Sequence, residues 1–231
     1  MRLDKYLSQS SGFSRKEVRR FLKIGEVTLN GEEVSNPALH IDEIEDEVYL
    51  SGYPLEAPGE KYLMLNKPIG CVCSNDDGTH PSVLSFIDLP RANELTICGR
   101  LDVDTTGLVL ITTDGQWAHR ITSPKHKTGK LYQVITADPI PEDAIEKFAK
   151  GLTLINDKVR TKPAELTIVS SHEAEVILTE GRYHQVKRMF AAIGNKVEEL
   201  HRAKIGQIEL DEELELGEYR FLTDEEINSI R

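Results

Sequence analysis

Apolar residues recur at helical spacing in the first part of the chain. Leu3 and Leu7 fit one face of a first short helix. Ser14 and Glu17 have the spacing of a capping box, in which the serine caps a helix and the glutamate reaches back to it. A second helix is therefore expected to begin at Ser14 and to end before Gly25. The apolar side of this helix is expected to hold Val18, Phe21 and Leu22.

An alternating pattern follows these helices. Residues 27–29 are typical of a strand, and the Asn-Gly pair at 30–31 favours a tight hairpin turn before a return strand. Residues 51–60 contain two prolines and two glycines, which is typical of a linker. We therefore expect a small module at residues 1–58 and a larger domain at residues 59–231.

Beyond residue 60 the pattern consists of short apolar runs with helical segments between them. Regular alternation of strand and helix is lacking, so we expect an α+β fold with a mixed, mainly antiparallel sheet. The expected helices are 115–122, 141–150, 183–193 and 224–230, and the expected strands are 62–66, 72–73, 108–112, 131–136, 164–169, 174–179 and 207–210.

Composition indicates a water-soluble protein, because 39% of the residues are hydrophobic, 29% are charged, and no apolar run approaches a membrane span. The N-terminus lacks the pattern of a secretory signal, so a cytoplasmic location is expected. Three cysteines, at positions 71, 73 and 98, favour buried cysteines on strands over disulfides or a zinc site.

The net charge of −11 at first argues against a nucleic-acid partner. The distribution of charge changes that conclusion, because residues 1–25 hold seven Lys/Arg against two acidic residues, a local balance of +5. Residues 115–137 hold four further basic residues and no acidic one. Each basic patch taken alone is equally compatible with an ordinary solvated helix face.

Residues 1–50 resemble an S4 RNA-binding domain. The matching positions are the opening Arg-Leu-Asp-Lys, Ser14-Arg15, Arg19-Arg20 and the Gly25-x-Val27-x-x-Asn30-Gly31 segment. The resemblance implies a module that docks on structured RNA through its basic helix, rather than a generic helical hairpin. The residues expected to contact RNA are Arg2, Lys5, Arg15, Lys16, Arg19, Arg20 and Lys23.

A polar loop between Gly99 and Gly107 is the strongest candidate for chemistry, since it leads directly into a core strand. Its two carboxylates are Asp102 and Asp104. From the residues alone they fit a glycosidase-like pair, part of a magnesium site, or turn residues that accept backbone hydrogen bonds. All three interpretations stay open at this point.

The Gly99-Arg100-Leu101-Asp102 form of this loop resembles the central motif of the pseudouridine synthases, in their RsuA branch. The resemblance spans nearly the whole chain. The other matching elements are Thr105-Thr106-Gly107-Leu108, Asn66-Lys67-Pro68-x-Gly70, Lys130-x-Tyr132-x-Val134, Glu180-Gly181-Arg182-x-x-Gln185-Val186-Lys187-Arg188-Met189 and Leu200-x-Arg202.

This resemblance implies that the chain converts uridine into pseudouridine without cofactor or metal, with Asp102 as the nucleophile. Attack on ribose C1′ and addition to uracil C6 both stay open. By resemblance, Tyr132 stacks on the flipped uracil and takes part in removing its C5 proton. Lys187 is the expected cation beside Asp102, and Asp104 is expected to shape the loop. The expected substrate contacts are Arg100, Leu101, Arg182, Gln185, Lys67 and Arg202, with Arg182 also the second choice for that cation.

By resemblance, the target is a single uridine of 16S ribosomal RNA, at position 516 in the usual rRNA numbering. A small-subunit assembly intermediate is the expected partner, and the protein is expected to act as a monomer away from membranes. Two alternatives are a non-catalytic ribosome-assembly factor and a synthase for 23S rRNA or tRNA. The motifs distinguish these targets poorly, because RNA choice depends on shape and backbone contacts over a surface.

Overall fold

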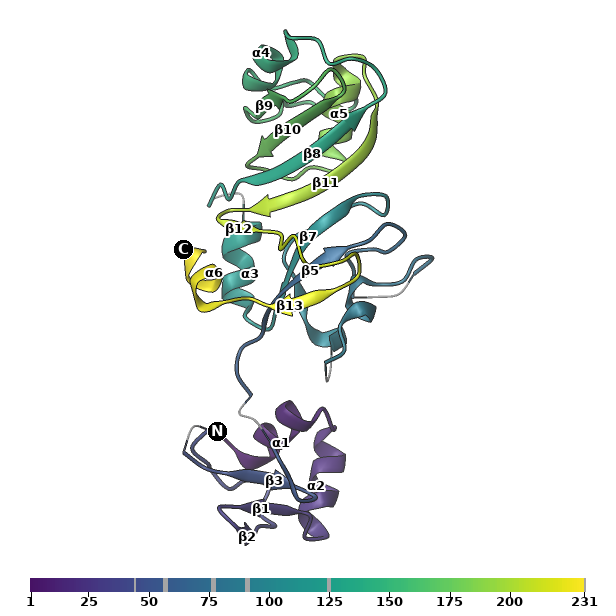
Figure 1. Ribbon diagram of the computed structural model, residues 1–231. Coiled ribbons are helices and arrows are strands. Elements are labelled where there is room, and N and C mark those ends of the chain that lie inside the picture. Colours follow the sequence, from purple (N-terminus) through teal and green to yellow (C-terminus); the bar gives the residue numbers. More distant parts are fainter. Residues whose placement is uncertain (44, 56–57, 76–77, 90–91, 124–125, 231) are drawn as a thin grey trace. The chain divides into compact units, whose positions relative to one another are not determined.

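The chain forms two compact units, each with its own apolar core (Figure 1). The first is built on Met1–Glu60, and the second on Lys61–Ile87 and Asn93–Arg231. The computed structural model describes residues 1–43, 45–55, 58–75, 78–89, 92–123 and 126–230.

In the first unit, helices α1 (Leu3–Ser11) and α2 (Arg15–Lys23) share a core with a small sheet. The predicted capping box at the start of α2 is present: Ser14 accepts a hydrogen bond from the Glu17 N–H, and the Glu17 carboxylate accepts one from the Ser14 N–H. The predicted apolar side of α2 is confirmed, since Val18 and Leu22 are buried. The buried core comprises Leu3, Tyr6, Leu7, Val18, Leu22, Val27, Ile41, Val48 and Leu50.

The sheet of the first unit has the order β2-β1-β3-β4. The predicted hairpin is confirmed, because Asn30 and Gly31 take the left-handed φ angles of 51° and 85° that a tight turn requires. Part of the expected linker is instead a strand: a turn at residues 51–52 returns the chain, so that Tyr53 pairs with Leu50. The strands are β1 (Val27–Leu29), β2 (Glu32–Glu33), β3 (Val48–Leu50) and β4 (Tyr53–Pro54).

The second unit is built on a sheet whose main path is β13-β5-β7-β11-β8-β10-β9, with β6 paired to β7 and β12 paired to β11. Among the described residues, the pairing of β7 with β11 is parallel and the others are antiparallel, which confirms the mixed, mainly antiparallel sheet. The strands are β5 (Tyr62–Lys67), β6 (Thr96–Ile97), β7 (Thr106–Thr112), β8 (Lys130–Thr136), β9 (Glu165–Ile168), β10 (Glu173–Leu178), β11 (Val197–Ile205), β12 (Ile208–Glu209) and β13 (Tyr219–Phe221).

Helices lie beside both ends of this sheet (Figure 1). The Trp117 indole of α3 is buried in the core and donates a hydrogen bond of 3.1 Å to the Ile227 carbonyl of α6. The predicted capping box of α6, between Thr223 and Glu226, is present. The helices are α3 (Gly115–Thr122), α4 (Ala144–Ala149), α5 (Gln185–Ala192) and α6 (Asp224–Ser229), with 3-10 turns at Val83–Phe86 and Ala92–Glu94.

Strand β11 is the main element that the sequence pattern did not predict. It pairs with β7 on one side and β8 on the other, so it lies inside the sheet. Its sequence is rich in charged residues and lacks the alternation of a half-buried strand. Pairing on both edges therefore overrides the local pattern. The expected strand at residues 72–73 is reduced to a single bridge between Val72 and Ser82.

Within the described residues, all three cysteines are buried, as predicted, and none of them forms a disulfide, but they lie beside strands and not in them as expected. The same residues contain no helix long and apolar enough to cross a membrane. They also contain no group of three or more His, Cys, Asp or Glu side chains placed to hold a metal ion.

Candidate active site

A cavity of about 620 Å³ opens beside the loop that carries Asp102, within the usual size of small-ligand sites. Its lining includes the 99–105 loop, β8 with Lys130 and Tyr132, the 178–186 segment and β11 with Leu200 and Arg202. Val72, Cys73, Thr122, Ser123 and Thr128 complete it. The cavity therefore brings together motif residues that are far apart in the sequence.

The loop that carries Asp102 is held through its own backbone. The Thr105 N–H donates to the Asp102 carbonyl at 3.1 Å, and the Gly70 N–H donates to the Val103 carbonyl at 2.8 Å. The Leu101 N–H donates to the Cys73 thiol sulfur at 3.3 Å. A loop fixed in this way holds a side chain in one position before any substrate binds.

Lys67 is buried beneath the same loop. Its ammonium donates to the carbonyl oxygens of Pro68 at 2.9 Å and Thr105 at 2.8 Å, and its exposed fraction is 0%. Burial lowers the pKa of Lys67. The expectation that Lys67 contacts substrate is wrong for this structure, because no part of its side chain reaches the cavity surface. It ties the strand end at β5 to the Asp102 loop instead.

Arg202 is also buried, with 1% of its surface exposed. Its Nε donates to the Leu108 carbonyl at 2.8 Å, and its Nη1 lies 3.5 Å from the Arg100 carbonyl. Arg202 lines the cavity, and its contact with substrate stays a prediction; two of its guanidinium nitrogens, Nε and Nη1, are directed at backbone carbonyls. Its Cα partner in the neighbouring strand β8 is Tyr132.

Asp102 has two basic neighbours from the start of α5. Lys187 Nζ lies 3.5 Å from Asp102 Oδ2, and His184 Nε2 lies 3.5 Å from Asp102 Oδ1. The predicted placement of Lys187 beside Asp102 is thus confirmed. Lys187 also donates a shorter hydrogen bond of 2.5 Å to Asp104 Oδ1, and this bond lowers the pKa of Asp104. The two loop carboxylates therefore share one ammonium.

Helix α5 presents Lys187 to the cavity because the chain turns sharply just before the helix begins. His184 takes a left-handed conformation with φ of 48° and ψ of 38°, an uncommon backbone for a residue with a side chain. Val186 and Phe190 pack into the core, which leaves Lys187 in the first turn directed at the Asp102 loop.

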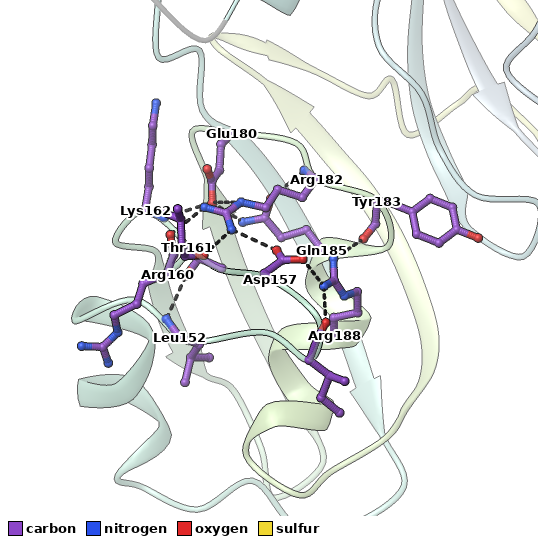
Figure 2. A network of polar contacts seen from close by, with 12 residues as sticks. Leu152, Asp157, Arg160, Thr161, Lys162, Glu180, Arg182, Tyr183, Gln185 and Arg188 are labelled. Atoms are coloured by element: carbon purple, nitrogen blue, oxygen red, sulfur yellow. Dashed lines mark hydrogen bonds and ion pairs between the residues drawn. The ribbon is translucent and has the colours of Figure 1, made fainter.

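Arg182 does not contact Asp102 and is held in a separate polar network (Figure 2). Its guanidinium bonds Asp157 Oδ2 at 3.0 Å and lies 3.4 Å from Glu180 Oε1. Gln185 is buried, accepts from the Arg182 N–H at 2.8 Å and donates to Glu180 at 2.7 Å. Both residues line the cavity, but their polar groups mainly organise the 180–188 segment.

Two family models match this chain. Residues 61–192 match the family model described as RNA pseudouridylate synthase, and residues 1–48 match the S4 domain model. The chain belongs to the RNA pseudouridine synthases. The fold and the motif-based assignment made from the sequence are both confirmed by these matches.

Relatives of this synthase match over their full length. It is 56% identical to the ribosomal small subunit pseudouridine synthase A of Vibrio vulnificus, covering 100% of this chain and 99% of that one. It is 52% identical to the protein of the same name from Escherichia coli K12, covering 100% of both chains. A solved structure described as a pseudouridylate synthase shares 50% identity over 100% of both chains, with a TM-score of 0.73.

Tyr132 of the synthase stands in the cavity wall on β8, with 9% of its surface exposed. Two residues earlier on the same strand, Lys130 also lines the cavity, and its ammonium donates to the Thr128 carbonyl at 3.2 Å. Burial, together with the charge of Arg202, lowers the pKa of Lys130 to about 8. Arg100 is exposed at the cavity, and Leu101 is buried beside it.

The seven basic residues expected to contact RNA are all exposed in the first unit of the synthase. Two of them also stabilise the fold, because Asp4 is buried and is bonded by Arg2 at 2.9 Å, with Arg19 at 4.0 Å. The hydrogen bond from Arg2 lowers the pKa of Asp4. The other five are Lys5, Arg15, Lys16, Arg20 and Lys23.

Sequence reasoning gave no role to His184 or Lys130, although both lie inside motifs that it identified. The pattern of apolar and polar residues does not predict a left-handed turn at His184. A lysine on a strand normally indicates a solvent-facing position, so Lys130 was not expected in the cavity wall. The one signal available for each was its place in a motif, since Lys130 is a motif position and His184 lies between Arg182 and Gln185. Their placement at the cavity required the three-dimensional structure.

Proposed function

We propose that this protein isomerises one uridine of 16S ribosomal RNA to pseudouridine, with Asp102 as the nucleophile. The observation that carries the proposal is a carboxylate on a backbone-clamped loop, 3.5 Å from the Lys187 ammonium, in the cavity that Tyr132 also lines. The names of the full-length relatives support a ribosomal small-subunit RNA as substrate.

The reaction needs a nucleophile that leaves again. The C1′–N1 bond breaks, the uracil turns, C5 bonds to C1′, the C5 proton departs and N1 gains a proton, so the product is an isomer of the substrate. The Asp102 carboxylate forms a transient bond to the ribose or to the uracil ring and is then released. The Lys187 ammonium stabilises the carboxylate anion in a half-buried setting, where charges interact more strongly than in water.

A stacked nucleotide cannot reach Asp102, so the target uridine is expected to flip out of its helix into the cavity. Tyr132 offers an aromatic face in the cavity wall on which the uracil stacks. Proton removal from C5 requires a base near this ring, and Tyr132 is our candidate for it. The clamped loop reduces the entropy that is lost when the reacting groups are brought together.

The exposed basic side of α2 is expected to hold the RNA, because neutralising phosphates supplies much of the affinity in such complexes. We further propose that a small-subunit assembly intermediate is the natural substrate, that the target is position 516, and that the protein works as a cytoplasmic monomer.

The test is tritium release from RNA labelled at uracil C5. Wild-type protein is incubated with unmodified 16S rRNA, with a small-subunit assembly intermediate, with 23S rRNA and with tRNA, and the new pseudouridine is mapped. Release from 16S rRNA or the intermediate, at position 516, supports the proposal. Release from 23S rRNA or tRNA alone would replace the substrate, and binding without release from any RNA would favour a non-catalytic assembly factor.

A further inference from the structure

Tyr183 is an exposed aromatic residue at the cavity that the reaction does not use. Its side chain is among the most exposed large apolar groups described, at 74%, and it lines the same cavity as Asp102. Figure 2 shows its ring pointing away from the polar network that holds the neighbouring residues. Single exposed aromatic residues are common on protein surfaces, so exposure alone does not indicate a binding role for Tyr183.

Tyr183 also stacks on the ring of its neighbour His184. The two rings stack face to face, with centroids 3.7 Å apart and an interplanar angle of 21°. His184 has a left-handed backbone, and uncommon backbone conformations of this kind are found preferentially at functional sites. The His184 ring also reaches Asp102 with its Nε2 atom. One ring thus faces the nucleophile while the other extends the stack toward solvent.

The backbone beneath these rings is fixed before any ligand arrives. Arg188 donates to the Tyr183 carbonyl at 3.3 Å and to Asp157 Oδ1 at 2.6 Å. Arg182, on the other side of Tyr183, bonds the second oxygen of Asp157. An aromatic group on a rigid segment loses little conformational freedom when it binds, which favours it as a contact surface.

We propose that Tyr183 and His184 form a stacking platform for the RNA base directly before or after the flipped uridine in the RNA sequence. This inference rests on the proposed function and deepens it by naming a second nucleotide subsite. Flipping breaks the stacking of the neighbouring bases, and an exposed ring at the cavity can replace the contact that such a base has lost. Every base has a flat face, so the platform stabilises the flipped state without reading sequence.

The experiment uses a 16S rRNA fragment that carries the mapped target uridine, with 2-aminopurine placed directly on its 5′ or its 3′ side. Stacking on an aromatic ring quenches the fluorescence of this base. Wild-type protein is expected to quench one of the two probes on binding. Tyr183→Ala should abolish that quenching and raise KM in the tritium assay about tenfold, since one stacked base contributes a factor of this order.

Two variants serve as controls. Tyr183→Phe keeps the ring and should behave as wild type. Phe221→Ala removes another half-exposed aromatic of the same unit, on β13 and away from the cavity, and should leave quenching and KM unchanged. Because Tyr183 is largely exposed, its replacement should not affect the thermal unfolding temperature, which is measured in parallel.

The platform is refuted if Tyr183→Ala binds with quenching and KM equal to wild type. A loss confined to kcat with quenching intact refutes it as well, since the ring would then act on Asp102 through His184. Failure of the proposed function has a different signature, because wild-type protein would then release no tritium from 16S rRNA or the assembly intermediate.

Discussion

Gly107 lies against the backbone of Arg202 so closely that a Cβ atom at Gly107 would stand 2.4 Å from the Arg202 carbonyl oxygen. The φ angle of Gly107 is 105°, which side chains rarely tolerate. The contact lies where β7 and β11 pair in parallel, directly after the loop that carries Asp102. Any side chain here must separate the two strands that support the site.

Gly107→Ala is therefore expected to lower the free energy of unfolding by about 2–4 kcal/mol and to reduce activity. The measurement is urea-induced unfolding together with tritium release. Gly115→Ala is the matched control, because a Cβ there meets nothing within 4 Å and Gly115 opens helix α3. The control should be as stable as wild type or slightly more stable, since alanine favours helix. Equal stability of the two variants would contradict the close contact.

Asp102→Asn should reduce tritium release by on the order of 10³-fold or more while RNA binding persists, because asparagine keeps the shape of the side chain but is not a nucleophile. The check is single-turnover tritium release alongside a filter-binding titration. Asp104→Asn is the natural comparison, since it alters the other carboxylate that shares Lys187. A fully active Asp102→Asn protein would exclude the proposed nucleophile.

Lys187→Met should raise the pKa of Asp104 toward its usual value, because the hydrogen bond from Lys187 is the main cause that lowers it. The check is a carboxyl-carbon NMR titration. Asp114 is the control: its pKa is lowered chiefly by the backbone N–H of Trp117, and it should titrate alike in both proteins. The interaction with Lys187 favours folding above the unfolded pKa of Asp104 and fades as pH falls. An unchanged Asp104 titration would show that Lys187 does not bond Asp104 in solution.

Lys130→Met should stabilise the protein at pH 7 by about 1–3 kcal/mol, since wild type holds a partly buried lysine whose pKa is lowered to about 8. The sign follows from proton counting. Between the folded pKa of about 8 and the unfolded pKa of about 10.4, the unfolded chain binds the extra proton, so wild-type stability rises with pH. The advantage of the variant should therefore shrink between pH 8 and pH 10. Urea unfolding at several pH values measures it, and a constant difference would contradict the burial.

Arg20→Gln combined with Lys23→Gln should weaken binding of 16S rRNA and flatten its salt dependence, because both residues are exposed on the basic side of α2. Each lost phosphate contact is expected to reduce the slope of log affinity against log salt by about one. Lys147→Gln combined with Lys150→Gln is the charge-matched control, since both lysines are exposed, one in α4 and the other directly after it. Equal salt slopes in the two double variants would remove α2 from the RNA interface.

Elements with local signals could be predicted from the sequence. Helix α2 carries its capping box and apolar stripe in consecutive residues, and the hairpin after it carries an Asn-Gly turn. Strand β11 has no such signal, because its charged side chains are accommodated only by neighbours brought from distant parts of the chain. A prediction from the local pattern of apolar and polar residues therefore misses this strand.

The same distinction applies to the site. Motif resemblance predicts Lys187 beside Asp102, and the structure confirms that contact. Resemblance gives a residue's position in a motif but not its depth in the protein. Lys67 and Arg202 are both expected to contact substrate, yet both are almost fully buried and donate hydrogen bonds to backbone carbonyl oxygens. A cation is buried where backbone carbonyl oxygens accept its hydrogen bonds, and the position of those carbonyls depends on the fold and is not visible in a sequence motif.

The parallel pairing of β7 with β11 has a consequence for how the protein is made. Thr106 is paired with His201, so the support of the Asp102 loop comes from a segment synthesised roughly 95 residues later. The first unit is built on Met1–Glu60, so it is synthesised well before Val197, where β11 begins. The second unit can therefore fix the Asp102 loop in place only after β11 has been synthesised and has joined the sheet, so the native site is completed late in synthesis.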